Sequence, residues 1–158
     1  MFKTVIWATD GSEAADAALP FAKALVEAEA GELVVVHANE VFVGRAGGYP
    51  VLADETELEQ KIRRQIDELR IEGIDATFKL VSGVYADPAH TIADVASELD
   101  ADAIVVGTRG HSTIAGLLVG SVTHRLLHIA PCPVLAVPHT KAAAATTAER
   151  DTHAVAPS

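Results

Sequence analysis

The chain has 158 residues, of which 49% are hydrophobic and 22% are charged, and its formal net charge at pH 7 is −10. This length suits one domain and excludes two full ones, and the composition is that of a globular protein rather than a disordered, collagen-like or disulfide-built chain. Aromatic residues make up only 4%, and the net negative charge repels a phosphate backbone, so we expect no nucleic acid partner.

The first part of the chain has the pattern of a strand, a helix and a second strand. Lys3 to Thr9 is rich in β-branched and aromatic residues and predicts a buried strand. Apolar residues then recur at spacings of three and four between Ser12, a candidate N-cap, and Gly31, which we expect to close the helix. Pro20 predicts a kink in this helix or a late start. Leu33 to His37 is nearly all apolar, which is typical of a strand covered on both faces.

The middle of the chain predicts a loop, an amphipathic helix and an edge strand. Asn39 to Ala53 contains three glycines and a proline without periodicity, and we interpret it as a loop. From Asp54 the sequence is charged but keeps one apolar stripe, which ends at Gly73. The stripe consists of Leu58, Ile62, Ile66 and Leu69. Ile74 to Val81 alternates like a half-exposed edge strand, and we expect Ser82 and Gly83 to break it.

The last part of the chain adds two helices and two strands. Asp87 and Pro88 are a cap and a first-turn proline, and they predict the start of a helix. Ala103 to Val106 is a uniformly apolar strand, Val122 to Ile129 has helical spacing, and Val134 to Val137 is a short final strand. Because strands and helices alternate throughout, the sequence predicts an α/β fold with a doubly wound five-stranded parallel sheet and helices on both faces.

The end of the fourth strand is the place where we expect chemistry. Ligands of open parallel sheets bind beyond the carboxyl ends of the strands. Here Gly107 and Gly110 follow the strand, and Gly120 and Ser121 open the next helix. Glycines let main-chain amides approach a phosphate closely, and a helix start adds unpaired N–H donors at its positive end. This arrangement favours an anion site.

Charge supports the same segment. No Asp or Glu occurs in the 46 residues from Ala103 to Ala148, where the overall acid content would place about six. Arg109 and His111 add positive character, whereas the helix after the first strand begins with Glu13 and Asp16, which repel phosphate. Burial of apolar strands is an alternative explanation for the missing acids, and Arg109 and His111 can also be solvated loop residues.

Other sequence signatures of catalysis or nucleotide binding are absent. The chain has no GxxxxGK[ST] phosphate loop, no GxGxxG after the first strand, no GxSxG elbow and no HExxH pattern. His124 and His128 are four residues apart and could share a metal, but no acid lies near them in the sequence, so we interpret them as helix-surface histidines. We therefore predict no catalytic residues and no resident metal.

The spacing of Gly107, Gly110, Gly120 and Ser121 matches the G-x2-G-x9-G-[ST] pattern of the ATP-binding universal stress proteins. Residues 1–138 resemble that family throughout. The resemblance implies a Rossmann-like sheet of strand order 3-2-1-4-5. It also implies that Asp10 contacts the nucleoside, although a helix-capping or turn role competes for that residue.

The remaining site residues implied by the resemblance fall into two groups. The backbone of His37 and Ala38 would hold adenine. The phosphate site would consist of Gly107, Arg109, Gly110, Gly120, Ser121 and Val122. Mg²⁺ would arrive only with the nucleotide, because no cluster of acids forms a site for it alone.

The resemblance implies a regulatory protein that binds ATP and hydrolyses it slowly at most, acting on a client that the sequence does not identify. It further implies a homodimer formed through the Val134–Val137 edge strand, and a plain protected edge is the alternative. AMP or cyclic AMP as ligand, a nucleotide-free interaction module and a slow enzyme remain open. Binding is favoured over turnover because no dedicated base is visible.

The division of the chain and its location are also predicted. We expect one nucleotide-binding domain over residues 1–138 and a low-complexity tail over residues 139–158. Cys132 is the single cysteine and lies between two prolines, so neither a disulfide nor a cysteine metal site is possible within the chain. No stretch has the pattern of an export signal or a membrane helix. A cytoplasmic location without a membrane partner is therefore expected.

Overall fold

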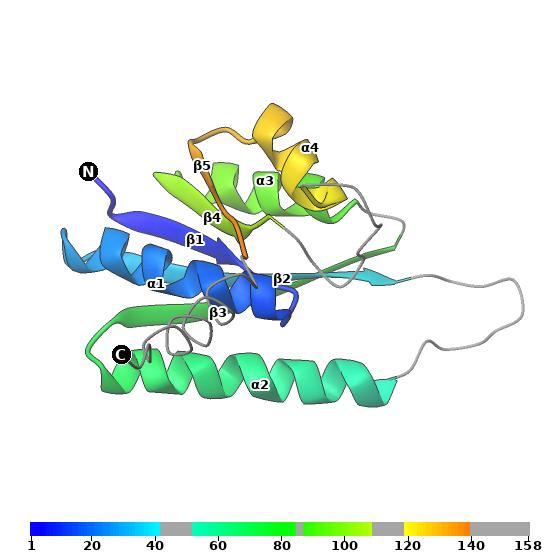
Figure 1. Ribbon diagram of the computed structural model, residues 1–158, viewed down its shortest axis with the longest axis horizontal. Helices are drawn as coiled ribbons and strands as arrows, with labels where there is room; N and C mark the ends of the chain where they lie inside the picture. Colours follow the sequence, from blue (N-terminus) through cyan, green and yellow to red (C-terminus); the bar gives the residue numbers. More distant parts are fainter. Residues whose placement is uncertain (42–51, 85–86, 109–118, 140–158) are drawn as a thin grey trace, which may run out of the picture.

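The computed structural model describes residues 1–41, 52–84, 87–108 and 119–139, which form five parallel strands alternating with four helices (Figure 1). The strands are β1 (Thr4–Ala8), β2 (Glu32–Val41), β3 (Asp75–Val84), β4 (Ala103–Gly107) and β5 (Val134–Val137). The helices are α1 (Glu13–Glu27), α2 (Leu52–Ile71), α3 (Pro88–Glu98) and α4 (Ser121–Ile129). The strand order is β3-β2-β1-β4-β5, which confirms the expected doubly wound sheet with β3 and β5 at its edges.

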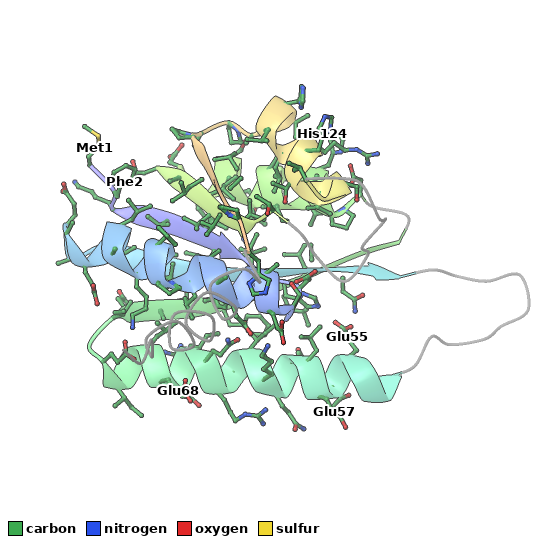
Figure 2. The ribbon with its side chains drawn as sticks, in the orientation of Figure 1. Met1, Phe2, Glu55, Glu57, Glu68 and His124 are labelled. Carbon is green, nitrogen blue, oxygen red and sulfur yellow. The ribbon has the colours of Figure 1, made fainter. Side chains whose placement is uncertain are left out.

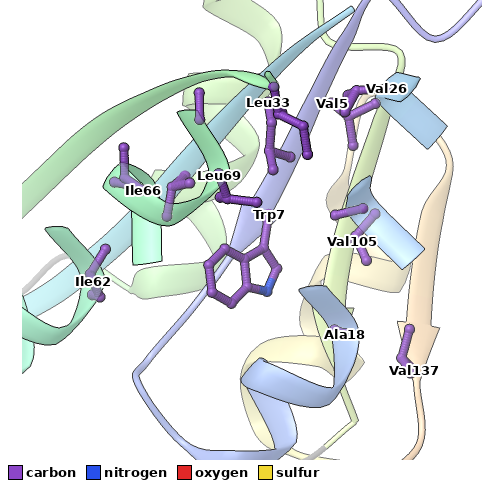
Figure 3. Close-up of a cluster of buried hydrophobic side chains, with 14 residues drawn as sticks. Val5, Trp7, Ala18, Val26, Leu33, Ile62, Ile66, Leu69, Val105 and Val137 are labelled. Atoms are coloured by element: carbon purple, nitrogen blue, oxygen red, sulfur yellow. The ribbon is translucent and has the colours of Figure 1, made fainter. Parts of the chain in front are cut away.

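Helices cover both faces of the sheet, so the central strands are buried on both sides. Side chains of a strand alternate between its two faces. Trp7 of β1 therefore lies in one core layer with Ala18 of α1 and Ile62 of α2, as Figure 3 shows. Ile6 lies in the other layer, with Ile92 of α3 and Leu126 of α4. This double burial explains why β1, β2 and β4 contain continuous apolar runs.

The local signals at two helix starts are confirmed. Ser12 is the N-cap of α1, and its hydroxyl accepts a hydrogen bond of 3.2 Å from the amide of Ala15. Asp87 caps α3 through the amide of Ala89 at 3.3 Å, and Pro88 is the first helical residue. In both helices a first-turn amide has no acceptor within the helix, and the side-chain oxygen of the cap residue accepts its hydrogen bond.

The predicted boundaries of the first helix are wrong at one end. The helix starts at Glu13, so Pro20 does not delay its start. The Ser12 side chain accepts a hydrogen bond from a first-turn amide, and Pro20 removes only one N–H donor from the interior of the helix. It ends at Glu27 with Ala28 as C-cap rather than at Gly31. The chain then turns so that the amide of Gly31 donates to the carbonyl of Val26 at 2.9 Å.

Strands β2 and β3 are both longer than the sequence pattern predicted. β2 continues to Val41 and α2 begins at Leu52, so the ends of the expected Asn39–Ala53 loop belong to regular elements. β3 runs through Ser82 and Gly83 instead of breaking there, because residues 82–84 pair in parallel with residues 39–41. Residues 42–51, and the expected tail from residue 140 onward, lie outside the described part of the chain.

Candidate functional site

The turn after β1 lies at the carboxyl edge of the sheet and is held by hydrogen bonds from main-chain amides to side-chain oxygens. The amide of Ser12 donates to Asp10 Oδ1 at 3.0 Å, and the amide of Gly11 donates to Thr9 Oγ1 at 3.0 Å. Gly11 has a φ of +75°, a left-handed conformation that residues with a Cβ rarely adopt. Asp10 therefore has the turn role that the sequence analysis gave as the alternative to ligand binding. A carboxylate that accepts this hydrogen bond can also contact a ligand, so the two roles are compatible.

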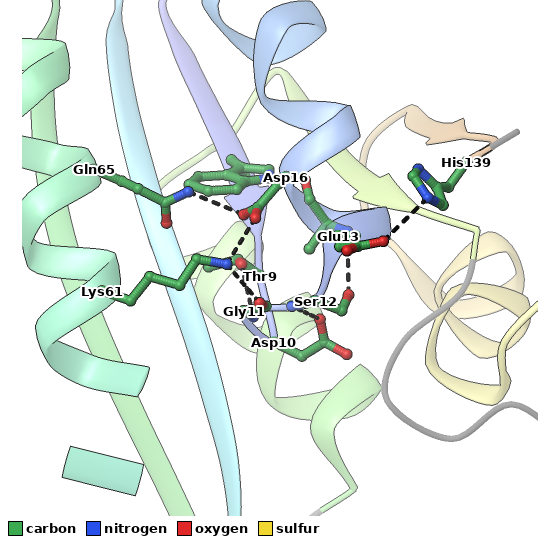
Figure 4. A network of polar contacts seen from close by, with 11 residues as sticks. Thr9, Asp10, Gly11, Ser12, Glu13, Asp16, Lys61, Gln65 and His139 are labelled. Carbon is green, nitrogen blue, oxygen red and sulfur yellow. Dashed lines mark hydrogen bonds and ion pairs between the residues drawn. The ribbon is translucent and has the colours of Figure 1, made fainter. Parts of the chain in front are cut away.

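Helix α2 clamps this turn from the side. Lys61 Nζ donates to the carbonyl oxygen of Gly11 and to Asp16 Oδ2, both at 2.7 Å, and Gln65 Nε2 donates to Asp16 Oδ1 at 2.9 Å (Figure 4). Asp16 was expected to repel an anion from the start of α1, and the ion pair with Lys61 offsets part of that charge. Lys61 and Gln65 were missed because nothing in their sequence context is a motif. Their spacing of four beside the apolar stripe of α2 was the only available signal.

Among the predicted site residues that the structure describes, His37 is the most buried polar side chain. Its ring is 6% exposed, with Nδ1 2.9 Å from the carbonyl oxygen of Thr9 and Nε2 2.7 Å from Glu55 Oε1. Figure 2 shows Glu55 on the side of α2 that faces the sheet, whereas Glu57 and Glu68 lie on the opposite side. The sequence singled out the backbone of His37 and Ala38. The structure adds a side chain that joins the ends of β1 and β2 to the first turns of α2.

The end of β4 and the start of α4 are held together by two hydrogen bonds. Thr123 Oγ1 donates to the carbonyl of Gly107 at 2.8 Å, and the amide of Gly120 donates to the carbonyl of Thr108 at 2.5 Å. The structure thus brings Gly107 and Gly120 to one place, as the spacing required. Arg109 and Gly110 lie outside the described residues.

Gly107 has a packing reason to lack a side chain. A Cβ built on this residue would lie 2.4 Å from the carbonyl oxygen of Ala14 and 3.0 Å from the amide nitrogen of Ala15. The first turn of α1 thus rests directly on the end of β4. This glycine is required by the fold whether or not a phosphate approaches it.

The start of α4 differs in charge from the start of α1. Gly120 is its N-cap without a side-chain hydrogen bond, and the first turn contains no acid, whereas the first turn of α1 contains Glu13 and Asp16. Ser121 is exposed and Val122 is half-buried. Because the amides of a first helical turn have no acceptor within the helix, this end of α4 is suited to an anion.

Helix α4 is also tied to α3 on the same face of the sheet. Asp87 Oδ2 accepts hydrogen bonds from Arg125 Nη1 at 2.6 Å and from His90 Nδ1 at 2.8 Å. Partial burial raises the pKa of this carboxyl, but the hydrogen bonds from Arg125, His90 and the Ala89 amide outweigh burial and hold the pKa below its usual value. The ionised carboxylate therefore helps to position α4.

Strand pairing places the predicted site residues at one edge of the sheet. Ala8 of β1 is in register with Val36 of β2 and with Val106 of β4. Asp10, Ala38 and Thr108 each follow these positions by two residues, so they lie at the same carboxyl edge. Within the described residues, no group of three or more His, Cys, Asp or Glu side chains is arranged to hold a metal ion.

Comparison with known proteins decides the family. The family model described as the universal stress protein family matches residues 1–138. The chain belongs to this family. A universal stress protein from Thermus aquaticus is 35% identical over 145 residues, which cover 87% of this chain and 99% of the relative. The resemblance of residues 1–138 to the universal stress protein family is confirmed.

Solved universal stress proteins share the Rossmann-like fold. One in complex with cAMP has a TM-score of 0.65 at 28% identity, covering 87% of this chain and 97% of its own. Another, from Archaeoglobus fulgidus in complex with dAMP, has a TM-score of 0.63 at 25% identity, covering 87% and 98%. In the part of the chain that the structure describes, no helix is long and apolar enough to span a membrane.

Proposed function

We propose that this universal stress protein binds an adenine nucleotide, with ATP as the leading ligand, across the carboxyl edge of β1, β2 and β4. The observation that carries the proposal is the acid-free start of α4, which two hydrogen bonds hold against the end of β4. The phosphates would lie at Gly107, Gly120, Ser121 and Val122, with Arg109 and Gly110 from the segment between them. Mg²⁺ would accompany the triphosphate.

The nucleoside would lie toward β1 and β2. Asp10 would accept hydrogen bonds from ribose hydroxyls, and its contact with the Ser12 amide fixes the carboxylate in place. The backbone of His37 and Ala38 would face adenine. The ring of His37 is already occupied by Thr9 and Glu55, so it would support that backbone rather than contact the base.

A nucleoside monophosphate is the second candidate ligand. The relatives solved with cAMP and dAMP support it, because both ligands contain adenine, a sugar and a single phosphate. The start of α4 can hold one phosphate as well as several.

Binding rather than turnover is the output that we propose. Main-chain amides bind phosphate well, but they supply neither the lysine nor the positioned base that fast phosphoryl transfer uses. ATP hydrolysis would therefore be slow at most, and the bound nucleotide would regulate contact with a client protein.

We also propose that residues 1–138 form the nucleotide-binding domain and that two copies pair through β5. Leu135 on this edge strand is 40% exposed, and Pro133 and Pro138 limit pairing to the four residues between them. A nucleotide-free homodimer that acts only as an interaction module is the rival function. A cytoplasmic location stays a prediction.

The first experiment identifies any nucleotide that copurifies with the chain. The freshly purified protein is denatured, the released small molecules are separated and weighed by mass spectrometry, and ATP, AMP and cyclic AMP are titrated calorimetrically into the nucleotide-free protein. Release of an adenine nucleotide, or saturable heat with one of the three, supports the proposal. No release and no heat with any of them would support the interaction module.

A pair of variants at Ser121 separates binding from folding. Ser121→Asp places a carboxylate at the first residue of α4, where it stabilises the helix but repels phosphate. We expect affinity for ATP to fall about tenfold or more while thermal stability is unchanged or higher. Ser121→Ala is the matched control, and it should retain most of the affinity. Equal affinity of Ser121→Asp and Ser121→Ala would contradict the assignment of the phosphates to α4.

A further inference from the structure

Two histidines on the outer surface of α4 form a pair that the nucleotide site does not use. His124 and His128 are exposed and one turn apart, and their ring centroids lie 4.8 Å from each other at an interplanar angle of 42°. Figure 2 shows His124 on the side of α4 that faces away from the sheet. Neither ring packs in the core.

The proton on one ring of this pair is fixed by the backbone. His128 Nδ1 lies 2.8 Å from the carbonyl oxygen of His124. Because a carbonyl oxygen only accepts, Nδ1 must carry the hydrogen, and Nε2 of the neutral ring then presents a lone pair. Histidines that bind metals usually donate their other ring N–H to a backbone carbonyl or a carboxylate in this way. His128 is therefore preorganised as a ligand.

The ring separation fits a shared cation. With N–metal bonds of about 2.1 Å, two imidazoles on one ion have centroids roughly 4.5 to 5.2 Å apart for ligand angles between about 90° and 110°. The observed separation of 4.8 Å lies in this range. Arg125 lies between the two histidines in sequence. Its Nη1 donates a hydrogen bond of 2.6 Å to Oδ2 of Asp87, the N-cap of α3, so its positive charge is paired there.

We propose that His124 and His128 form a two-imidazole site for a late first-row divalent cation such as Zn²⁺ or Cu²⁺. Imidazole nitrogen suits these ions, whereas Mg²⁺ and Ca²⁺ prefer oxygen ligands. No acid occurs between Ala103 and Ala148, so α4 itself offers no carboxylate, and water would complete the coordination shell. The ion would bridge two turns of a nine-residue helix whose first turn forms the proposed phosphate site.

The site is tested with Zn²⁺ and the full chain in the absence of nucleotide. Competition with a chromogenic chelator should give one site per chain, and His124→Ala and His128→Ala should each weaken it about tenfold or more, because the second imidazole acts at high effective concentration. His90→Ala is the matched control, since His90 is exposed but its Nδ1 is directed to Asp87. This control should bind Zn²⁺ like the wild type.

A second readout identifies the ligand atoms. With one equivalent of Cu²⁺, electron paramagnetic resonance should show coupling to two imidazole nitrogens, reduced to one or none in His128→Ala. Zn²⁺ should also raise the melting temperature of the wild type but not that of His124→Ala. The proposal is overturned if both variants bind Zn²⁺ like the wild type, or if only His153→Ala, in the C-terminal segment, abolishes binding. Because no nucleotide is present, either outcome leaves the proposed function untouched.

Discussion

The buried ring of His37 is hydrogen-bonded to the side chain of Glu55. His37 Nδ1 faces the carbonyl oxygen of Thr9, an acceptor, so this nitrogen carries a hydrogen. Nε2 then lies 2.7 Å from Glu55 Oε1, and an ionised carboxylate is also only an acceptor. A contact of this length is a hydrogen bond, so one proton lies between the two atoms.

This relationship predicts different effects for two substitutions of Glu55. Glu55→Gln supplies an amide N–H that donates to Nε2 of the neutral ring, so the contact survives without charge. Glu55→Ala removes the contact and leaves Nε2 of a buried ring without its partner, which we expect to lower the free energy of unfolding by about 1 to 2 kcal/mol. Urea unfolding at pH 7 measures both variants. If Glu55→Ala were as stable as the wild type, the contact would not anchor α2.

Gly107 gives a prediction that separates packing from ligand binding. In Gly107→Ala the new Cβ would meet backbone atoms of Ala14, at 2.4 Å from its carbonyl oxygen, and backbone cannot rotate away as a side chain can. We expect the nucleotide-free protein to lose roughly 1 to 3 kcal/mol of unfolding free energy, measured by urea denaturation. A glycine needed only for phosphate approach would predict unchanged stability in the absence of nucleotide.

The fold was largely predictable because its signals are local. Ser12, Asp87 and Pro88 mark helix starts by chemistry that acts within three residues. The strand order came from the family resemblance rather than from the residues alone. The extension of β2 through Asn39 and Glu40 was not predictable, because its polar sequence looks like a loop and only pairing with β3 makes it a strand.

The site was predictable only where a motif exists. The glycine spacing pointed to the end of β4 and the start of α4, and the structure brings those two ends together. Lys61 and Glu55 lie among the charged residues of α2, and their sequence pattern is that of a solvent-facing helix surface. Lys61 is 50 residues from its partner Gly11, so no local pattern connects them.

Lys61 should matter more than an ordinary surface lysine. Its Nζ bonds a carbonyl oxygen in the turn at Gly11 as well as the Asp16 carboxylate. Lys61→Met keeps the apolar stem but removes both contacts, and we expect a loss of about 1 kcal/mol together with weaker nucleotide binding through a looser Asp10 turn.

Lys79→Met is the matched control for that variant. Lys79 makes an exposed ion pair with Glu98 at 3.1 Å, and such pairs contribute between about 0 and 1 kcal/mol. Stability should change little and nucleotide affinity not at all. Equal effects of the two lysine substitutions on affinity would show that the contacts of Lys61 with Gly11 and Asp16 do not act on the nucleotide site.

Asp87 predicts how acid weakens the packing of α3 against α4. Its pKa is lower in the folded protein than in the unfolded chain, so the unfolded state binds the proton more readily and stability falls as pH drops through the folded pKa. Asp87→Asn still caps α3 but cannot ionise, and we expect it to cost about 1 kcal/mol or less at pH 7. This difference from the wild type should shrink below about pH 4, where the Asp87 carboxyl of the unfolded wild type begins to bind a proton, and vanish once the pH has passed below the lower pKa of the folded state. Urea unfolding between pH 2.5 and 7 measures this difference.

An Arg125→Gln background tests the cause of the pKa shift. The pH-dependent part of the difference should be smaller there, because Arg125 makes the strongest of the hydrogen bonds that lower the pKa of Asp87. A stability difference between wild type and Asp87→Asn that stayed constant across the pH range would rule out the ionised Asp87 as the link between the two helices.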